Sequence, residues 1–456
     1  PEEDIRRVTG LDIERVVATK ADIDTISRSF YDLKTSLKTA EAQLRQGRIS
    51  TVDIGNQEFL STNQEDLDPA AAPVVKALDH ILSYAFEQRA SDIHFEPKRD
   101  LTLVRLRIDG ILHDVHVIPK IVYQAVVSRL KLLSGMNLAE KRRPQDGRIK
   151  RDEKGREVEL RVSTMPTAFG EKAVLRIFDP DILMKGIEEL GFAGPEFLKV
   201  LSFIERPNGI VLVTGPTGSG KTTTLYPILR HLSKPHVNIV TIEDPVEMVI
   251  EDFNQVSVRP QIDVTFANAL RTVLRQDPDI VMVGEIRDAE TADNAVQAAL
   301  TGHLVLSTLH TNDAPSSITR LLDLGVPGFL VTSTLVGIIA QRLVRTNCAS
   351  CLVEHAPTDE EIAALRVPRE KLAGVVFKSG SGCLQCRQTG YSGRDGIYEI
   401  MAMTDRTRAL VAKGSSSVEI RKAAREEGLR SLRESAFEKV VRGRTTVAEL
   451  VRVTGK

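Results

Sequence analysis

Hydrophobic positions follow two different patterns along the chain. From about residue 186 onward, short runs that are apolar at every position alternate with segments of helical periodicity. Four of these runs lie within GIVLVTG, VNIVTIEDP, DIVMVGEI and HLVLSTLH. Strands that are apolar on both faces belong in a parallel sheet that helices cover on each side. The pattern therefore predicts an α/β domain over residues 186–456.

A different pattern precedes this domain. Residues 73–88 have helical spacing, with an apolar face formed by Val74, Val75, Leu78, Ile81, Leu82, Ala85 and Phe86. Two strand-like segments then flank Asp109-Gly110, a dipeptide typical of a hairpin turn. A further helix and a strand pair extend to about residue 180. The sequence thus predicts a small α+β domain over residues 71–185.

The first 36 residues are too few to bury a core alone. Residues 1–36 indicate a short strand and then a helix from Lys20 to Leu33, and the polar residues 37–70 predict a linker. The chain begins at Pro1 rather than with methionine, which suggests that it is part of a longer protein.

Composition narrows the function classes. The 456 residues are 42% hydrophobic and 27% charged, as in ordinary globular proteins. Basic and acidic residues number 61 and 62, a net charge of -1, so a broad electrostatic footprint for nucleic acid is missing. This argues against a nucleic-acid translocase. The sequence has no run of 18 apolar residues, so we expect any membrane association to depend on partners.

A glycine-rich loop follows the first apolar strand, in GIVLVTGPTGSGKTTT. Glycines let backbone N–H groups turn inward toward phosphate oxygens, the lysine reaches the β- and γ-phosphates, and the threonine hydroxyl joins magnesium. An accidental glycine-rich turn would not combine strand, loop and helix start in this order. The sequence predicts a P-loop NTPase, with nucleotide-binding residues Gly215, Pro216, Thr217, Gly218, Ser219, Gly220, Lys221 and Thr222.

Two further strands end in acidic residues. Glu243 and Asp244 follow one strand and Glu285 follows another, where Gly284 replaces the aspartate that often supports magnesium. Because parallel strands present their carboxyl ends to one crevice, we expect both tips beside the P-loop. Glu285 would orient the attacking water while Glu243 or Asp244 supports magnesium. Asp244, before a proline, is as readily explained as a helix cap.

Two histidines flank the strand in TGHLVLSTLHT. His303 lies at its beginning and His310 at its end. A lone histidine is usually structural, but two beside a strand of the NTPase sheet favour a sensor role near the γ-phosphate.

All four cysteines occur as two Cys-x2-Cys pairs, in a segment (residues 341–395) that we treat as a subdomain ahead of a helical tail at 396–456. The pairs are Cys348 with Cys351 and Cys383 with Cys386. Four thiolates close a tetrahedral zinc site without a histidine. The 31-residue gap between the pairs must carry its own structure, for which TDEEIAALR is a candidate helix. Redox disulfides or buried free thiols are the competing readings.

These motifs together resemble the secretion ATPase superfamily, which drives type IV pilus assembly and type II secretion. Its four signature boxes resemble GPTGSGKTTT, TIEDPVE, LRQDPDIVMVGEIRD and TGHLVLSTLHTND, and its N-terminal domain resembles RASDIHFEP and EKRRPQDGRI. The resemblance covers about residues 70–456, and residues 1–36 resemble the end of a further N-terminal domain. It implies a RecA-like P-loop motor domain, a preceding small α+β (PAS-like) domain and a zinc-bearing subdomain. Glycine is the usual residue at position 284 in this family.

The resemblance also implies function. RVSTMPTAFGEKAVLR resembles the segment that supplies the family's arginine fingers, here Arg161 and Arg176. Glu243 and Glu285 match its two acidic boxes, and which of them activates water stays open. The cofactors implied are ATP, Mg²⁺ and Zn²⁺. Retraction motors typically lack the cysteines, so the extension or secretion branch is implied. A scaffold that binds ATP without turnover would not need Lys221 together with both glutamates.

The family implies further expectations about assembly and location. We expect a homohexamer in the bacterial cytoplasm, peripheral at the inner membrane, with a polytopic platform protein as partner. Other machinery proteins would bind through the region that precedes this chain, and nucleic acid is not expected. Pilus assembly is the favoured process, and type II secretion is the alternative.

Overall fold

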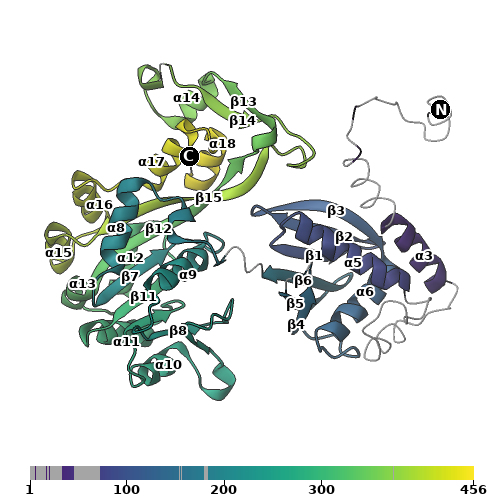
Figure 1. Cartoon of the computed structure of the whole chain (residues 1–456), viewed down its shortest axis with the longest axis horizontal. Helices are drawn as coiled ribbons and strands as arrows, with labels where there is room; N and C mark the ends of the chain where they lie inside the picture. Colours follow the sequence, from purple (N-terminus) through teal and green to yellow (C-terminus); the bar gives the residue numbers. More distant parts are fainter. Residues whose placement is uncertain are drawn as a thin grey trace. The chain divides into compact units, whose positions relative to one another are not determined.

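The computed structural model describes residues 33–45, 72–178 without 154 and 156, and 183–455 without 373, together with residues 6, 17 and 20. It forms two compact units, Pro1–Phe178 and Asp179–Lys456 (Figure 1). The boundary lies seven residues before the predicted one at 185. Most of the strand and helix predicted within residues 1–36 lies outside the described residues. No helix in the described ranges combines the length and apolar character needed to span a bilayer.

The first unit is a six-stranded antiparallel sheet with helices against one face (Figure 1). Its strand order is β3-β2-β1-β6-β5-β4. The elements are α3 (Leu33–Arg45), α5 (Ala72–Glu87), β1 (Asp92–Pro97), β2 (Leu101–Ile108), β3 (Ile111–Pro119), α6 (Lys120–Leu133), β4 (Gln145–Asp152), β5 (Glu157–Thr167) and β6 (Gly170–Phe178). The prediction of a small α+β domain is confirmed.

Local sequence explains two features of this unit. Asp109 and Gly110 have φ values of 50° and 83°, the left-handed pair that a tight hairpin turn requires, which confirms the turn between β2 and β3. The predicted linker at 37–70 was wrong over residues 37–45, which belong to α3. Leu33, Leu37 and Ala40 are buried because their helical spacing places them together against the core of the unit.

The second unit contains a seven-stranded sheet of order β15-β12-β7-β11-β10-β8-β9. All its pairings are parallel except that of β12 with β15. The strands are β7 (Gly209–Thr214), β8 (Ile239–Glu243), β9 (Asn254–Ser257), β10 (Ile280–Val283), β11 (Leu304–Leu309), β12 (Leu335–Asn347) and β15 (Tyr391–Ala402). The four apolar runs are β7, β8, β10 and β11, so the parallel sheet is confirmed.

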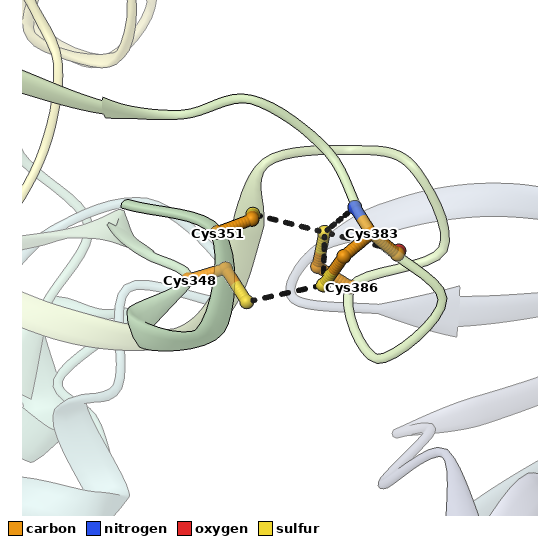
Figure 2. Close-up of side chains that lie close together, drawn as sticks. All are labelled: Cys348, Cys351, Cys383 and Cys386. Atoms are coloured by element: carbon orange, nitrogen blue, oxygen red, sulfur yellow. Dashed lines mark hydrogen bonds between the residues drawn. The ribbon is translucent and has the colours of Figure 1, made fainter. Parts of the chain in front are cut away.

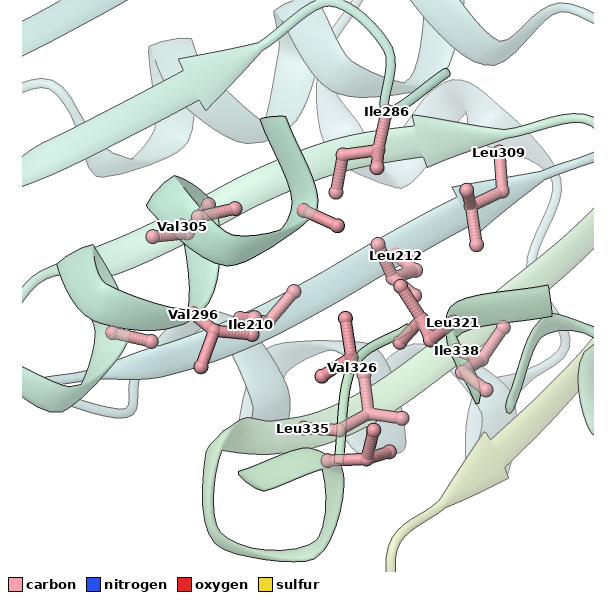
Figure 3. Packing of buried hydrophobic residues seen from close by; sticks show 14 of the residues in the cluster. Ile210, Leu212, Ile286, Val296, Val305, Leu309, Leu321, Val326, Leu335 and Ile338 are labelled. Atoms are coloured by element: carbon pink, nitrogen blue, oxygen red, sulfur yellow. The ribbon is translucent and has the colours of Figure 1, made fainter. Parts of the chain in front are cut away.

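Helices bury both faces of this sheet. One face packs on α10 (Phe266–Val273), α11 (Ala289–Leu300), α12 (Ala314–Asp323) and α13 (Gly328–Thr334). The other face packs on η4 (Ile187–Leu190), α8 (Gly194–Ile204) and α9 (Lys221–Leu232). Figure 3 shows the first of these cores, where Ile210 of β7 lies beside Val296 of α11. This two-sided burial is why the strands are apolar at every position.

A small module and a helical tail complete the unit. The module consists of η6 (Ala349–Cys351), β13 (Leu352–His355), α14 (Asp359–Leu365), η7 (Arg369–Leu372) and β14 (Phe377–Gly380). The tail consists of α15 (Asp405–Ala412), α16 (Ser417–Glu426), α17 (Leu432–Val441) and α18 (Val447–Thr454). The candidate helix between the cysteine pairs is α14.

The predicted boundaries of this region need correction. Those at 341 and 395 cut through β12 and β15, which pair with each other and join the module to the main sheet. The helical tail therefore begins at Asp405 rather than at 396, because residues 396–402 form the carboxyl-terminal part of β15, where residues 396–401 are buried.

Candidate functional site

The glycine-rich loop leaves the buried strand β7 and enters helix α9. Gly215, Gly218 and Gly220 have φ values of 154°, 78° and 86°, which favour glycine. A Cβ on Gly215 would lie 2.5 Å from the Gln341 carbonyl oxygen, so the loop also needs glycine for space. The loop leads directly into the amino end of α9, and the first backbone N–H groups of a helix favour an anion there.

Lys221, the first residue of α9, lies across this loop. Its Nζ donates to the carbonyl oxygens of Gly215 at 2.9 Å and Pro216 at 3.4 Å. Burial lowers the pKa of Lys221 to about 8. An anion placed beside Nζ would favour the charged form and offset that shift. The buried Ser219 Oγ has no hydrogen-bond partner among the described residues. Both observations fit a loop that holds phosphate oxygens.

A residue that sequence reasoning missed supports the loop from behind. Gln341 of β12 is buried, and its side-chain amide donates to the Ser219 carbonyl oxygen at 2.7 Å. The Gln341 side-chain oxygen accepts from the Thr224 hydroxyl, also at 2.7 Å. Gln341 therefore connects the loop and helix α9 to β12. Removing it would leave two buried polar groups unsatisfied, at a cost of about 1–3 kcal/mol each.

A small cavity of about 160 Å³ opens beside Lys221 at the carboxyl edge of the sheet. Its lining residues are Lys221, Thr222, Leu225, Glu243, Asp244, Pro245, Glu247, Phe266, Met282, Gly284, Glu285, Thr308 and His310. The structure thus brings together the loop lysine and threonine, both strand-tip glutamates and one of the two histidines. They converge because β7, β8, β10 and β11 run parallel.

Glu285 interacts with cationic and polar neighbours. It forms an ion pair with Arg287, and its Oε2 lies 3.1 Å from His310 Nε2. The pKa of His310 is lowered by burial and by the charges of Lys221 and Arg287. The neutral ring can then donate its Nε2–H to Glu285. Arg287 also lies 3.8 Å from Asp244 Oδ2, so it links the two strand tips.

Space explains the missing aspartate at position 284. A Cβ on Gly284 would lie 3.1 Å from the Ile242 carbonyl oxygen and 3.4 Å from the ring of Phe266. A larger residue would push β10 away from β8, to which the Gly284 N–H bonds at 2.8 Å.

Glu243 has a different environment. Its side chain is buried and accepts hydrogen bonds from the Tyr226 and Thr241 hydroxyls, each at 2.7 Å, and from the Gln255 amide at 3.1 Å. A carboxylate offers about four acceptor sites, so three donors leave one open. All three donors are uncharged, in contrast to the partners of Glu285.

The structure does not bring His303 to this cavity. It precedes β11 at the amino edge of the sheet, and its Nδ1 lies 2.8 Å from the Ala298 carbonyl oxygen and 3.1 Å from the Thr301 hydroxyl. Only the carboxyl ends of parallel strands meet the phosphate loop. Strand direction could therefore have distinguished His303 from His310 in the sequence.

Arg161 and Arg176 lie in the first unit, directly opposite each other on β5 and β6. Arg176 is 64% exposed, and its Nε donates to Asp92 Oδ1 at 3.2 Å. The Arg161 guanidinium lies 4.2 Å from the ring centroid of Phe178. Register places both in one row across the sheet, with Arg107 and Asp92 on one side and Arg148 on the other. The row therefore contains four arginines and one aspartate, which makes this strip of the sheet basic.

The four cysteines form a compact cluster between η6 and the turn after β14 (Figure 2). The Cys348–Cys383 and Cys351–Cys386 sulfur distances are 3.8 Å, and Cys383–Cys386 is 3.7 Å. A disulfide needs about 2.05 Å, whereas four sulfurs bound at about 2.3 Å to a tetrahedral zinc ion lie about 3.8 Å apart. The donor set fits zinc.

Backbone donors surround the Cys386 sulfur. The N–H groups of Cys383 and Gly390 lie 3.2 Å and 3.3 Å from it. Although burial opposes ionisation, these donors and the neighbouring thiols lower the pKa of Cys386 to about 6. Burial raises the pKa of Cys351 to about 11. Gly380, at the end of β14, and Gly390, just before β15, lie against each other. A Cβ on Gly380 would lie 2.1 Å from the Gly390 carbonyl oxygen, so this close approach requires glycine.

The glycine loop, the parallel sheet and the acidic strand tips define the fold of a P-loop NTPase. The chain belongs to the family described as Type II/IV secretion system protein, whose match spans residues 68–452. It is therefore a member of the secretion ATPases.

Relatives from two kinds of machinery are similar to it. The type IV pilus assembly ATPase TfpB of Acinetobacter baylyi is 48% identical over 438 residues, which are 94% of this chain and 72% of that protein. Type II secretion system protein E of Xanthomonas campestris pv. campestris is 44% identical over 453 residues, 99% of this chain and 78% of that protein. The crystal structure of the pilus retraction motor PilT with bound ADP is 26% identical, with a TM-score of 0.56 over 83% of this chain and 97% of that one.

Proposed function

We propose that this chain is a magnesium-dependent ATP hydrolase that powers type IV pilus assembly. The observation that supports this most is the cavity that joins Lys221 and Thr222 to Glu243 and Glu285. The loop N–H groups and Lys221 would bind the β- and γ-phosphates, and the Thr222 hydroxyl would hold Mg²⁺. When bound, Mg²⁺ neutralises charge on the phosphates.

The two glutamates would divide the remaining work. A permanent cation beside a carboxylate weakens it as a proton acceptor more than neutral hydrogen-bond donors do. Glu285 is paired with Arg287, whereas the partners of Glu243 are neutral and leave one acceptor site open. We therefore assign Glu243 as the base for the attacking water, which reverses the division of roles expected from the sequence. Glu285, with His310, would orient the water shell of magnesium.

Substituting each glutamate separately tests this division. Glu243→Gln should keep ATP affinity but lower kcat by about 10²–10⁴-fold, because an amide cannot accept the proton. Glu285→Gln should instead raise the Mg²⁺ concentration needed for half-maximal activity. Phosphate release and binding of a fluorescent nucleotide measure these effects. Glu290→Gln, at an exposed ion pair with Arg271, is the matched control. Wild-type turnover in both test variants would refute the hydrolytic site.

We propose that Arg161 and Arg176 act as arginine fingers in a homohexamer. Charge spreads over the γ-phosphate oxygens in the transition state, and the planar, permanently charged guanidinium stabilises it. Their position in one basic row supports this role.

The arginines predict complementation between subunits. Arg176→Ala should lower kcat by about 10³–10⁵-fold at nearly unchanged ATP affinity. Mixing Arg176→Ala with Lys221→Ala subunits should restore part of the activity, because each variant supplies the group that the other lacks. Arg105→Ala, on the same face but bonded to Asp114 at 2.7 Å, is the control. Full activity of Arg161→Ala and Arg176→Ala would contradict the proposal.

We also propose that the cysteine cluster is a structural zinc site. Four thiolates leave no open position for a substrate, so the metal would stabilise the module rather than take part in hydrolysis. The module lies between β12 and β15, and zinc would compensate for its small apolar core.

Elemental analysis should find about one zinc per chain. Cys383→Ser or chelation should unfold the module while ATP binding persists, as proteolysis and nucleotide titration would report. Gln385→Ala changes an exposed, non-ligating residue of the same turn and should retain the metal. Native protein with four alkylatable thiols and no metal would exclude the site.

The process served is also a proposal. The pilus relative from Acinetobacter baylyi supports pilus assembly, through a polytopic inner-membrane platform protein that the motor would contact from the cytoplasm. Type II secretion is the second candidate, supported by the relative from Xanthomonas campestris pv. campestris.

Deleting the gene in its host separates the two processes. We expect surface pili to disappear while extracellular enzyme levels stay unchanged. The wild-type gene, but not a Lys221→Ala allele, should restore pili. Loss of secretion with intact pili would assign the motor to type II secretion.

A further inference from the structure

Tyr226 connects the phosphate-loop helix to the buried glutamate. It lies in α9, five residues after Lys221, and its side chain is fully buried. The hydroxyl donates to Glu243 Oε2 at 2.7 Å, and Met248 O lies 3.3 Å away as a second acceptor. One side chain thus joins α9, the tip of β8 and the segment that follows β8.

The other carboxylate oxygen is held from two further elements. Glu243 Oε1 accepts from Thr241 of β8 at 2.7 Å and from the Gln255 amide of β9 at 3.1 Å. Gln255 also donates to Met248 O at 2.9 Å and accepts from the Ile250 N–H at 2.7 Å. Both carboxylate oxygens are therefore fixed by donors that are themselves anchored.

We propose that Tyr226 is a positioning residue that fixes the orientation of Glu243 and couples it to the phosphate-loop helix. This rests on the proposed role of Glu243 as the base. Tyr226 does not touch the reacting atoms itself, because its hydroxyl is turned toward the carboxylate and Met248. It acts through Glu243.

The chemistry of the phenol suits this role. Burial and the Glu243 charge raise the pKa of Tyr226 above its ordinary value, so the hydroxyl stays protonated and donates. A hydrogen bond to a carboxylate favours its charged form. Removing the hydroxyl therefore leaves Glu243 Oε2 without its donor from α9. It also frees the carboxylate to rotate, which lowers the fraction of well-oriented encounters.

Packing alone cannot account for the hydroxyl. The Tyr226 ring lies edge-on to Phe253 with centroids 6.5 Å apart. Phenylalanine would preserve this contact and the filled volume, so Tyr226→Phe isolates the hydrogen bond.

The decisive experiment compares Tyr226→Phe with wild-type protein in steady-state ATP hydrolysis over a range of ATP concentrations. We expect kcat to fall about 10-fold or more, with KM for ATP unchanged within about twofold. A fall in kcat at unchanged KM is the mark of lost orientation, because a general loss of structure at the site would change both. Tyr391→Phe, which loses a hydroxyl contact to Thr446 at 2.7 Å in the same unit, is the matched control and should behave as wild type.

A second pair of variants distinguishes loss of the hydrogen bond from loss of folding. Thr241→Val removes another donor to Glu243 and should likewise lower kcat at unchanged KM. Thr241→Ser keeps the hydroxyl and should retain activity. Thermal melting verifies that each variant is folded.

Combining substitutions separates this inference from the proposed function. Adding Tyr226→Phe to Glu243→Gln should lower kcat no further, because the target of the hydroxyl is already lost. If Glu243→Gln alone retains wild-type kcat, the assignment of the base fails. If Glu243→Gln is inactive while Tyr226→Phe and Thr241→Val keep the wild-type kcat, only the present inference is overturned.

Discussion

The parallel direction of four strands is the constraint on which the site depends. β7, β8, β10 and β11 all present their carboxyl ends to one edge of the sheet. Residues more than 60 positions apart in the sequence, such as Lys221 and Glu285, therefore line one small cavity. The same constraint sends His303 to the opposite edge. The register is maintained by two apolar cores, which fix the strands from both faces.

Buried polar contacts then refine the position of each group. Gln341 supports the phosphate loop, and Tyr226, Thr241 and Gln255 hold Glu243. Such groups are costly when unsatisfied, which makes each arrangement specific. Neighbouring carboxylates thereby acquire different environments: neutral donors surround Glu243, and Arg287 neutralises Glu285. Their chemical difference arises from these partners and not from the residue type.

The cysteine module extends the same sheet. Its chain leaves β12 after Asn347 and returns at Tyr391 in β15, so the antiparallel pairing of these strands anchors both ends. Gln341 lies on β12 seven residues before Cys348. One strand therefore supports the phosphate loop and leads into the metal-binding cluster. The local stability of the module and the rigidity of the phosphate loop therefore both depend on β12.

The sequence by itself determined the elements whose pattern is local. Continuous apolar runs identified the parallel strands, Asp109-Gly110 identified the hairpin, and the spacing of Gly215, Gly220 and Lys221 identified the phosphate loop. Cysteine spacing identified a donor set that the structure gathers within 4.8 Å. Each of these signals depends on residues close together in the chain.

Only the tertiary structure decided the rest. Gln341, Tyr226 and Gln255 have no local signal, because their partners come from other elements of the sheet. The extent of α3 depended on burial against the first unit's core, and the end of the cysteine segment depended on β12–β15 pairing. The need for glycine at 284 depended on Phe266 and the neighbouring strand. These features depend on contacts between distant segments, which no short pattern of residues encodes.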